Sequence, residues 1–308
     1  MPRFLLSRLI QSLVTLLLLS AVIFVLARAT GDPLALILPM VATEEDFANA
    51  RAYLGLDQPL PVQYLKFVGK AALGDFGTSI RSRRPVIELL AERLPASLAL
   101  AAFSMAVSLA IAFPLGVLAA VRKGSAVDTT AKVIAALGQS LPTFWVGIVL
   151  IEVVAGRLQW LPAGGDESFA HYILPGLTLG WFVIAGLMRL LRSSMLETLG
   201  AEYVKTARAK GATEAAIIWR HALKNALIPV VTFAGVYFSI LVTAAIVVET
   251  VFAWPGMGRL AYEAITARDF PVIQAVVLVT AVIVVVVNLV VDLLCAWIDP
   301  RIRLALRP

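Results

Sequence analysis

Six long apolar stretches recur along the chain, separated by polar segments. Each is close to the ~20 apolar residues that an α-helix needs to cross the hydrocarbon core of a bilayer. In lipid, backbone polar groups are satisfied only within helices or closed barrels. The pattern therefore predicts an all-α membrane protein with six transmembrane helices. The predicted spans are Leu9–Ala29, Ala96–Val121, Val133–Ala155, Ile173–Leu191, Ala226–Val248 and Val272–Ala296.

The first stretch has a second interpretation, as a cleaved signal peptide. Arg3 and Arg8 form a basic start, and Ala27 and Ala29 have the small-residue spacing of a cleavage site. However, the apolar run Leu9–Leu26 is longer than the ~7–15 residues usual for a signal peptide. We therefore expect this segment to be kept as a span.

The composition supports a membrane protein and excludes several other classes. Hydrophobic residues make up 60% of the chain and charged residues 15%, and the mean hydropathy is +0.90. Soluble domains have roughly 45–50% apolar and about 25% charged residues. The single cysteine, Cys295, excludes a disulfide framework and a CxxC redox or metal motif.

The distribution of Lys and Arg predicts the orientation of the chain. With a cytoplasmic N-terminus, fifteen basic residues fall in or beside inner segments and three in the two short outer loops. Cytoplasmic loops carry such an excess, so both termini are predicted to be cytoplasmic. The net charge of +6 is then explained by cytoplasmic loops, and we expect no nucleic-acid partner.

The chain is predicted to have three parts, which are residues 1–29, an extracytoplasmic segment 30–95, and a five-helix core 96–308 with an inner loop 192–225. The outer segment contains Gly-Pro turn signals and a predicted short polar helix, Glu44–Tyr53. It is interpreted either as a folded cap over the outer mouth or as a docking surface for a solute-delivering partner. The two interpretations are compatible.

The inner loop is predicted to be a helix, a glycine turn and a second helix. The first helix covers Ala201–Lys210, and Gly211 takes the left-handed position that follows a helix end. Thr213 is expected to cap the second helix, Glu214–Leu223. The residues expected to face lipid or a partner groove are Ala216, Ile217, Trp219, Ala222 and Leu223, with Glu214, Arg220 and Lys224 on the other side. A helix resting on headgroups and a helix inserted in a partner groove both fit this pattern.

Few ionisable or amide residues fall inside the predicted spans, and such residues are functional candidates. They are Glu152, Asn288 and Asp292. Glu152 lies near Arg157 at the outer end of span 3, where it is expected to snorkel or to line a pore. Asp292 is expected to pair with Arg189 or Arg192, and Asn288 to hydrogen-bond between helices.

The segment between spans 5 and 6 contains two Gly residues and a Pro after a tryptophan. This pattern predicts a tight bend anchored by an interfacial tryptophan. The alternative is an outer gate or docking element. The residues concerned are Trp254, Pro255, Gly256 and Gly258.

The sequence contains none of the common catalytic motifs. There is no GxxxxGK[ST] phosphate loop, no HExxH and no GxSxG. His171 and His221 are predicted on opposite sides of the membrane, so no shared metal site is expected. Catalytic residues and cofactors are therefore not expected on this chain.

Two stretches of the inner loop resemble the EAA loop of binding-protein-dependent ABC importer permeases. These are Glu202–Gly211 and Arg220–Pro229, in which Ala207, Gly211 and Leu223 fit the general pattern. Lys205, Thr206 and Lys224 depart from it, but the Thr-Ala-Arg-Ala-Lys-Gly form resembles the variant of the dipeptide/oligopeptide permease branch. The departures therefore favour that branch.

Further motifs extend the resemblance, in the correct order, over essentially the whole chain. They are Leu54–Pro61, Leu73–Ser79, Gln159–Pro162, Phe252–Gly258 and Trp297–Arg303. The resemblance implies a type I ABC importer permease fold in a prokaryotic inner membrane. It also implies a second permease subunit, expected as a heterodimer, two cytoplasmic ATPases that hold ATP and Mg, and an extracytoplasmic binding protein.

The resemblance assigns contact with the ATPases to the inner loop. The coupling residues it implies are Glu202, Ala207, Arg208, Lys210, Gly211, Ala212, His221 and Leu223. The solutes it allows are dipeptides, longer peptides, nickel chelates, opines and some sugars. Two other classes of function would leave different patterns. An ion-driven secondary transporter would need repeated halves and midplane charges, and an intramembrane enzyme would need paired catalytic residues. Neither pattern is evident, so the importer permease is favoured.

Overall fold

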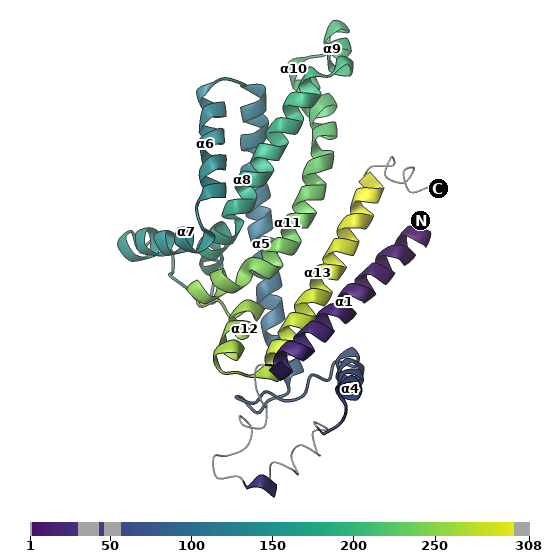
Figure 1. The fold of residues 1–308 in the computed structure, drawn as a ribbon. Coiled ribbons are helices and arrows are strands. Elements are labelled where there is room, and N and C mark those ends of the chain that lie inside the picture. The colour runs from purple at the N-terminus through teal and green to yellow at the C-terminus, as the bar shows by residue number, and fades with distance from the viewer. Residues whose placement is uncertain (1, 30–42, 46–56, 299–308) are drawn as a thin grey trace. The chain divides into compact units, whose positions relative to one another are not determined.

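The computed structural model describes residues 2–29, 43–45 and 57–298. These are almost entirely helical, and the only β pairing among them is an isolated bridge between Thr78 and Pro85. The helices are α1 Pro2–Ala29, α4 Leu60–Ala72, α5 Val86–Val121, α6 Ala126–Ser140, α7 Thr143–Leu150, η1 Ile151–Arg157, α8 Ala170–Gly200, α9 Glu202–Ala209, α10 Glu214–Ala216, η2 Ile217–Ala222, α11 Leu223–Val251, α12 Met257–Thr266 and α13 Phe270–Ile298 (Figure 1). The all-α prediction is confirmed.

Within the described residues, five helices are long and apolar enough to cross a membrane. They are Leu6–Arg28, Val86–Val121, Ala170–Gly200, Glu214–Val251 and Phe270–Leu294. A sixth candidate is a bent pair, Ala126–Ser140 and Thr143–Arg157, whose two helices meet at 106°. The expected number of spans is reached only if this bent pair counts as one span.

The third predicted span, Val133–Ala155, is not one straight helix, and that prediction was wrong. The chain breaks at Leu141 and Pro142, between α6 and α7. Proline lacks an N–H and disfavours helical backbone at the residue before it, and Leu141 is extended (φ −85°, ψ 130°). Hydropathy alone did not reveal this break, because both arms are apolar.

Helix α5 begins at Val86, well before the predicted start at Ala96. Its first turns carry Glu88, Glu92 and Arg93 among apolar residues, and these charges placed them outside the predicted span. The Arg84 side chain contacts Glu92 at 2.5 Å and Glu88 at 3.4 Å, which supports this helix start. Of the predicted helix Glu44–Tyr53, only Glu44 and Glu45 are described, and both are helical; the rest lies outside the described residues.

The structure divides into two compact units, and the first contains residues 1–96 and 255–285. In it, α4 packs on α1: the Ser20 and Tyr64 hydroxyls are 2.8 Å apart, and the Phe24 ring meets the edge of Tyr64. A second core joins α12 to the first turns of α5 and α13. Its buried members include Val86, Leu90, Met257, Leu260, Ala264 and Val272.

The second unit contains residues 97–254 and 286–308, and α8 is its central helix. Helix α8 contacts α6, α7 and α11, and 67% of its most apolar 18-residue stretch is buried. A Cβ added at Gly180 would lie 2.6 Å from the Ser108 hydroxyl of α5. Small residues allow such close helix approach in membranes, where van der Waals packing drives helix association.

Trp254 does not anchor an interfacial bend, and that prediction was wrong. Its side chain is fully buried and meets the edge of the Tyr172 ring at 4.5 Å between centroids. The backbone N–H of Gly165 donates to the Phe252 carbonyl (3.0 Å), so the loop before α8 covers this segment. A ten-residue helix, α12, then follows before α13, so the connection is not a tight turn.

Candidate functional site

The inner loop forms a compact elbow between α8 and α11 in the second unit, and "the elbow" here means residues 201–226 (Figure 1). Helix α9 ends at a turn in which Gly211 has φ +83°, the left-handed conformation predicted for it. The Thr213 hydroxyl accepts a hydrogen bond from the Ala216 N–H (3.3 Å), which confirms the predicted N-cap.

The first arm of the elbow is α9, and the second arm is the helical segment 214–226. The second arm differs from the prediction. The predicted helix end at Leu223 is wrong, because α10, η2 and α11 run as one helix, Glu214–Val251. The polar residues Arg220, Lys224 and Asn225 interrupt the apolar pattern but are compatible with a helix. Their polarity therefore predicts where the apolar stretch ends, and the helix continues past that point. The arm is a direct extension of a membrane span.

The inside of the elbow is apolar and buried. Val204 of α9 and Ile217, Ala222 and Ala226 of the second arm are fully buried, and α9 contacts both η2 and α8. Ile217, Ala222 and Leu223 were predicted to face lipid or a partner groove; this is wrong, because all three are buried inside the fold, where η2 contacts both α8 and α9. Trp219, with 57% of its surface exposed, is open as predicted.

Two polar contacts hold α9 to the second arm. The Arg208 guanidinium donates to both carboxylate oxygens of Glu214 (2.8 and 3.2 Å), and this hydrogen bonding raises the pKa of Arg208 above its ordinary value. The Asn225 amide donates to the Tyr203 hydroxyl (2.9 Å). Sequence reasoning missed this clamp; its only signal was the placement of polar residues on both sides of the predicted turn.

The predicted coupling residues fall into three groups by exposure. Those open to a partner are Glu202, Arg208, Lys210 and Gly211; Ala207, Ala212 and His221 are half-buried, and Leu223 is buried. Lys205 pairs with Glu202 on the open surface (2.7 Å). The surface that the elbow offers is therefore mostly charged, and Leu223 lies inside the fold.

Helix α8 connects the elbow to a buried ion pair that sequence reasoning also missed. The Asp128 carboxylate of α6 is fully buried and accepts from Arg192 Nε (2.5 Å) and Nη2 (3.0 Å). It also accepts from Lys132 Nζ and from the Gly124 N–H, both at 3.0 Å. Arg192 lies eight residues before the end of α8, about 12 Å along the helix.

The polar residues predicted inside the spans have defined surroundings. Asn288 accepts a hydrogen bond from the Ser239 hydroxyl (2.9 Å), the expected bond between helices. Glu152 pairs with Arg157 (3.0 Å), and both are well exposed. The two arginines predicted to pair with Asp292 bind other groups: Arg192 binds Asp128, and Arg189 donates to Gln139 (2.7 Å).

A buried carboxylate lies just beyond the predicted end of span 5. Glu249 is fully buried, and the Ser97 hydroxyl donates to its Oε1 (2.5 Å). The apolar pattern ends at Val248, so this residue falls outside the predicted span. Of the predicted gate residues, Trp254, Gly256 and Gly258 are buried and Pro255 is half-buried, which leaves them little surface for docking.

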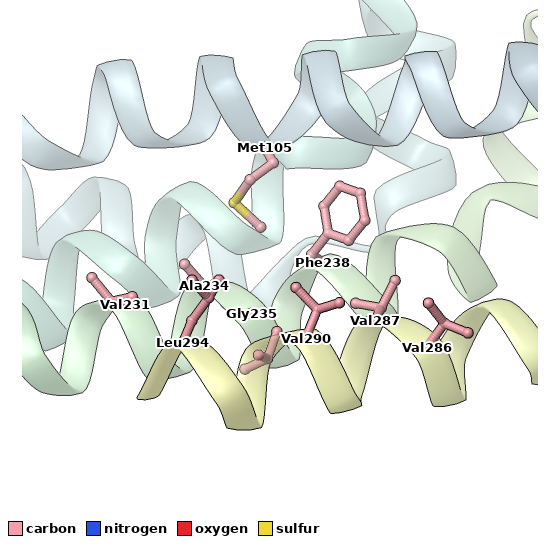
Figure 2. Close-up of a pocket in the computed structure, with 10 residues that line it drawn as sticks. Met105, Val231, Ala234, Gly235, Phe238, Val286, Val287, Val290 and Leu294 are labelled. Carbon is pink, nitrogen blue, oxygen red and sulfur yellow. The ribbon is translucent and has the colours of Figure 1, made fainter. Parts of the chain in front are cut away.

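The second unit contains an apolar cleft of about 370 Å³ between α5, α11 and α13. Figure 2 shows its walls, which are side chains of carbon with the sulfur of Met105 on one side. The other lining residues are Val231, Ala234, Gly235, Phe238, Val286, Val287, Val290, Val291 and Leu294. A zwitterionic solute would find no polar partner among these side chains, so the cleft is not assigned to solute recognition. In the part of the chain the structure describes, no group of three metal-ligating side chains occurs.

Comparison with known proteins identifies the family. Residues 112–304 match the family described as "Binding-protein-dependent transport system inner membrane component", and residues 1–101 match its N-terminal counterpart. The chain belongs to this family. It is a multi-pass permease of a prokaryotic inner membrane, and ATP hydrolysis belongs to a separate subunit of such importers. The permease is a translocation subunit that works with an ATPase and a binding protein.

Similar proteins cover nearly the full length of the permease. The glutathione transport system permease protein GsiC of Salmonella paratyphi A is 42% identical over 98% of this chain and 99% of its own length. The probable peptide ABC transporter permease protein y4tP of Sinorhizobium fredii is 41% identical over 97% of this chain and 99% of its own. The resemblance of the sequence to peptide-type ABC importer permeases is confirmed.

Solved structures support the fold. An inward-facing MetNI methionine ABC transporter aligns with a TM-score of 0.59 at 20% identity, over 68% of this permease and 96% of that chain. A chain of an amino acid ABC transporter aligns at 0.54 and 16% identity, over 70% and 94%. These neighbours share the fold, and the family assignment leaves the alternative of a secondary transporter without support.

Proposed function

We propose that this permease forms half of the translocation pathway for a short peptide, with glutathione-type peptides included. The support is the near-complete similarity to permeases named for glutathione and for peptides, together with the peptide-branch form of the residues around Gly211. A second, related permease completes the pathway as a heterodimer. A binding protein delivers the solute, and two ATPases hold ATP and Mg.

The observation that carries the coupling role is the construction of the elbow. Its second arm is continuous with α11, and its first arm follows directly from α8. The Arg208–Glu214 and Tyr203–Asn225 contacts and the buried Val204 fix the two arms to each other. A push on the charged outer surface is therefore passed to two helices as a rigid-body movement, and differential binding of ATP to the two states supplies the bias.

This role requires the elbow to face the cytoplasm. The basic residues of the inner segments support that orientation, with both termini on the same side. A cysteine placed at Ala215, in a chain whose Cys295 is replaced by alanine, tests it. Labelling by an impermeant maleimide in right-side-out vesicles would contradict the orientation, and labelling only in inverted vesicles would support it.

The central experiment removes the elbow's turn and leaves its charges in place. Gly211→Pro is incompatible with φ +83°, so we expect the permease to insert and the complex to assemble while uptake falls at least tenfold. Gly200→Ala is the matched control, since this glycine has ordinary backbone and open space around it. Uptake that survives Gly211→Pro would remove the coupling role.

A further inference from the structure

A polar loop of the first unit is held rigidly on one buried carboxylate. The Asp269 side chain is 2% exposed and accepts from the Ser79 hydroxyl (2.6 Å) and from the backbone N–H groups of Ile80 and Arg81 (both 3.2 Å). The Ser82 N–H donates to the Ser79 hydroxyl (2.9 Å). Residues 79–82 are therefore fixed in place before any partner binds.

This loop forms one wall of a cleft of about 320 Å³. The other walls come from the first turns of α5, from α12 and from the start of α13, and they are partly apolar through Leu89, Leu260 and Val272. The charged residues that line it are Arg81, Arg93, Glu263 and Asp269, with the hydroxyls of Ser79 and Ser82.

In the described part of the chain, both carboxylates that line this cleft have hydrogen-bond or ion-pair partners, whereas its two arginines do not. Both carboxylate oxygens of Asp269 accept hydrogen bonds from residues 79–81, and Glu263 pairs with Arg259 (2.9 Å). Within residues 2–29, 43–45 and 57–298, neither the Arg81 nor the Arg93 side chain has a hydrogen bond or an ion pair. Glu92, beside Arg93 in sequence, is bound by Arg84, and Arg93 acts on it only through its charge. The guanidinium groups of Arg81 and Arg93 are therefore available to bind a ligand in this cleft. A guanidinium group can donate two parallel N–H hydrogen bonds, which suits a carboxylate.

The surroundings favour a side chain of a docking protein over a free solute. Arg81 and Ser82 are exposed at the rim, whereas pockets for small molecules bury most of the ligand surface. The first turns of α5 carry Glu88, Glu92 and Arg93, which indicates an end of the helix that lies in water. The segment 30–95 is also the one predicted to be extracytoplasmic.

We propose that the Arg81–Arg93 cleft receives an acidic side chain of the solute-delivering binding protein. The carboxylate binds between the two guanidinium groups, and its methylene groups lie against Leu89, Leu260 and Val272. This inference rests on the proposed function, because it requires a binding protein at the outer face. It adds the chemistry by which that partner is recognised.

The test uses the complete importer in phosphatidylcholine nanodiscs and its fluorescently labelled binding protein. We expect Arg93→Ala to raise the Kd of the binding protein about tenfold and Arg81→Ala about fivefold, since both remove half of a partly desolvated pair. Arg93→Lys should keep most of the affinity. Arg83→Asn is the matched control: Arg83 is exposed and lies outside the cleft, and asparagine tolerates its left-handed backbone (φ +58°). It should change Kd less than twofold.

A charge-reversal experiment identifies the incoming residue. Arg93→Glu should weaken binding more than Arg93→Ala, because it places a like charge against the acidic side chain. Recovery of affinity when one acidic residue of the binding protein is changed to lysine would support the proposal and name that residue.

Two results would overturn the proposal. An equal loss of affinity in Arg83→Asn would assign the effect to long-range charge. An unchanged Kd in Arg93→Ala with a raised KM for peptides, but not for C-terminally amidated peptides, would assign the cleft to the solute. Co-purification of the ATPases tests the proposed function without involving Arg93, so the failures of the two proposals can be told apart.

Discussion

Two arginine–carboxylate pairs of the same geometry lie in very different surroundings. In the elbow, Arg208 and Glu214 are joined by two hydrogen bonds and both remain open to water. Between α6 and α8, Arg192 makes the same two bonds to Asp128, whose side chain is 1% exposed. Water competes with the first pair and is excluded from the second.

The difference shows that a pair's environment decides its contribution. An exposed pair is screened by salt and adds little to stability, so Arg208 and Glu214 serve mainly to orient the elbow. A buried pair is marginal as a whole but strongly destabilising when only one partner is removed. Asp128 and Arg192 therefore specify how α6 lies on α8, and they keep it there.

The largest effect is expected when the buried pair is halved. Asp128→Asn keeps the shape but leaves Arg192 without its counterion in a largely dry site. We expect the unfolding midpoint of the purified permease to fall by roughly 10 °C, measured by thermal denaturation in detergent. Glu152→Gln, which opens an exposed pair, should change it by less than about 2 °C. A comparable loss in both variants would erase the distinction between buried and exposed pairs.

An intermediate effect is expected when the buried pair is removed as a whole. Asp128→Leu combined with Arg192→Met leaves no unpaired charge between α6 and α8, and Lys132 can remain in water because its side chain is 55% exposed. The double variant should recover about half of the stability lost in Asp128→Asn, because the Gly124 N–H still lacks its acceptor. If the double variant recovers no stability, the loss in Asp128→Asn comes mainly from the unpaired Gly124 N–H and not from the unpaired charge.

The smallest effect is expected at the elbow. Arg208→Ala leaves Val204 buried and the Tyr203–Asn225 hydrogen bond intact, so the midpoint should fall by less than about 2 °C. The difference from the unmodified permease should shrink further in about 0.5 M salt, while the loss in Asp128→Asn persists. A salt-independent loss at Arg208 would mean that the elbow pair is protected from water.

Much of the elbow could be predicted from local signals. The left-handed Gly211 and the Thr213 cap depend on a few neighbouring residues, and turn chemistry is local. Some apolar residues of the second arm were given the wrong surroundings, because only the fold packs α8 and α9 against η2, which contains Ile217 and Ala222. Asp128 and Glu249 were missed because their partners, Arg192 and Ser97, are far away in the sequence.

The sequence by itself determined that the protein lies in a membrane, that it is helical, where most of its spans lie and which family it resembles. Hydropathy and short motifs are properties of neighbouring residues and can be read without the fold. Pro142 was a local signal for the bend in the third apolar run, although hydropathy did not reveal it. The tertiary structure alone decided which face of each helix is covered and which charges find partners. Those outcomes depend on contacts between distant segments, and local patterns do not contain that information.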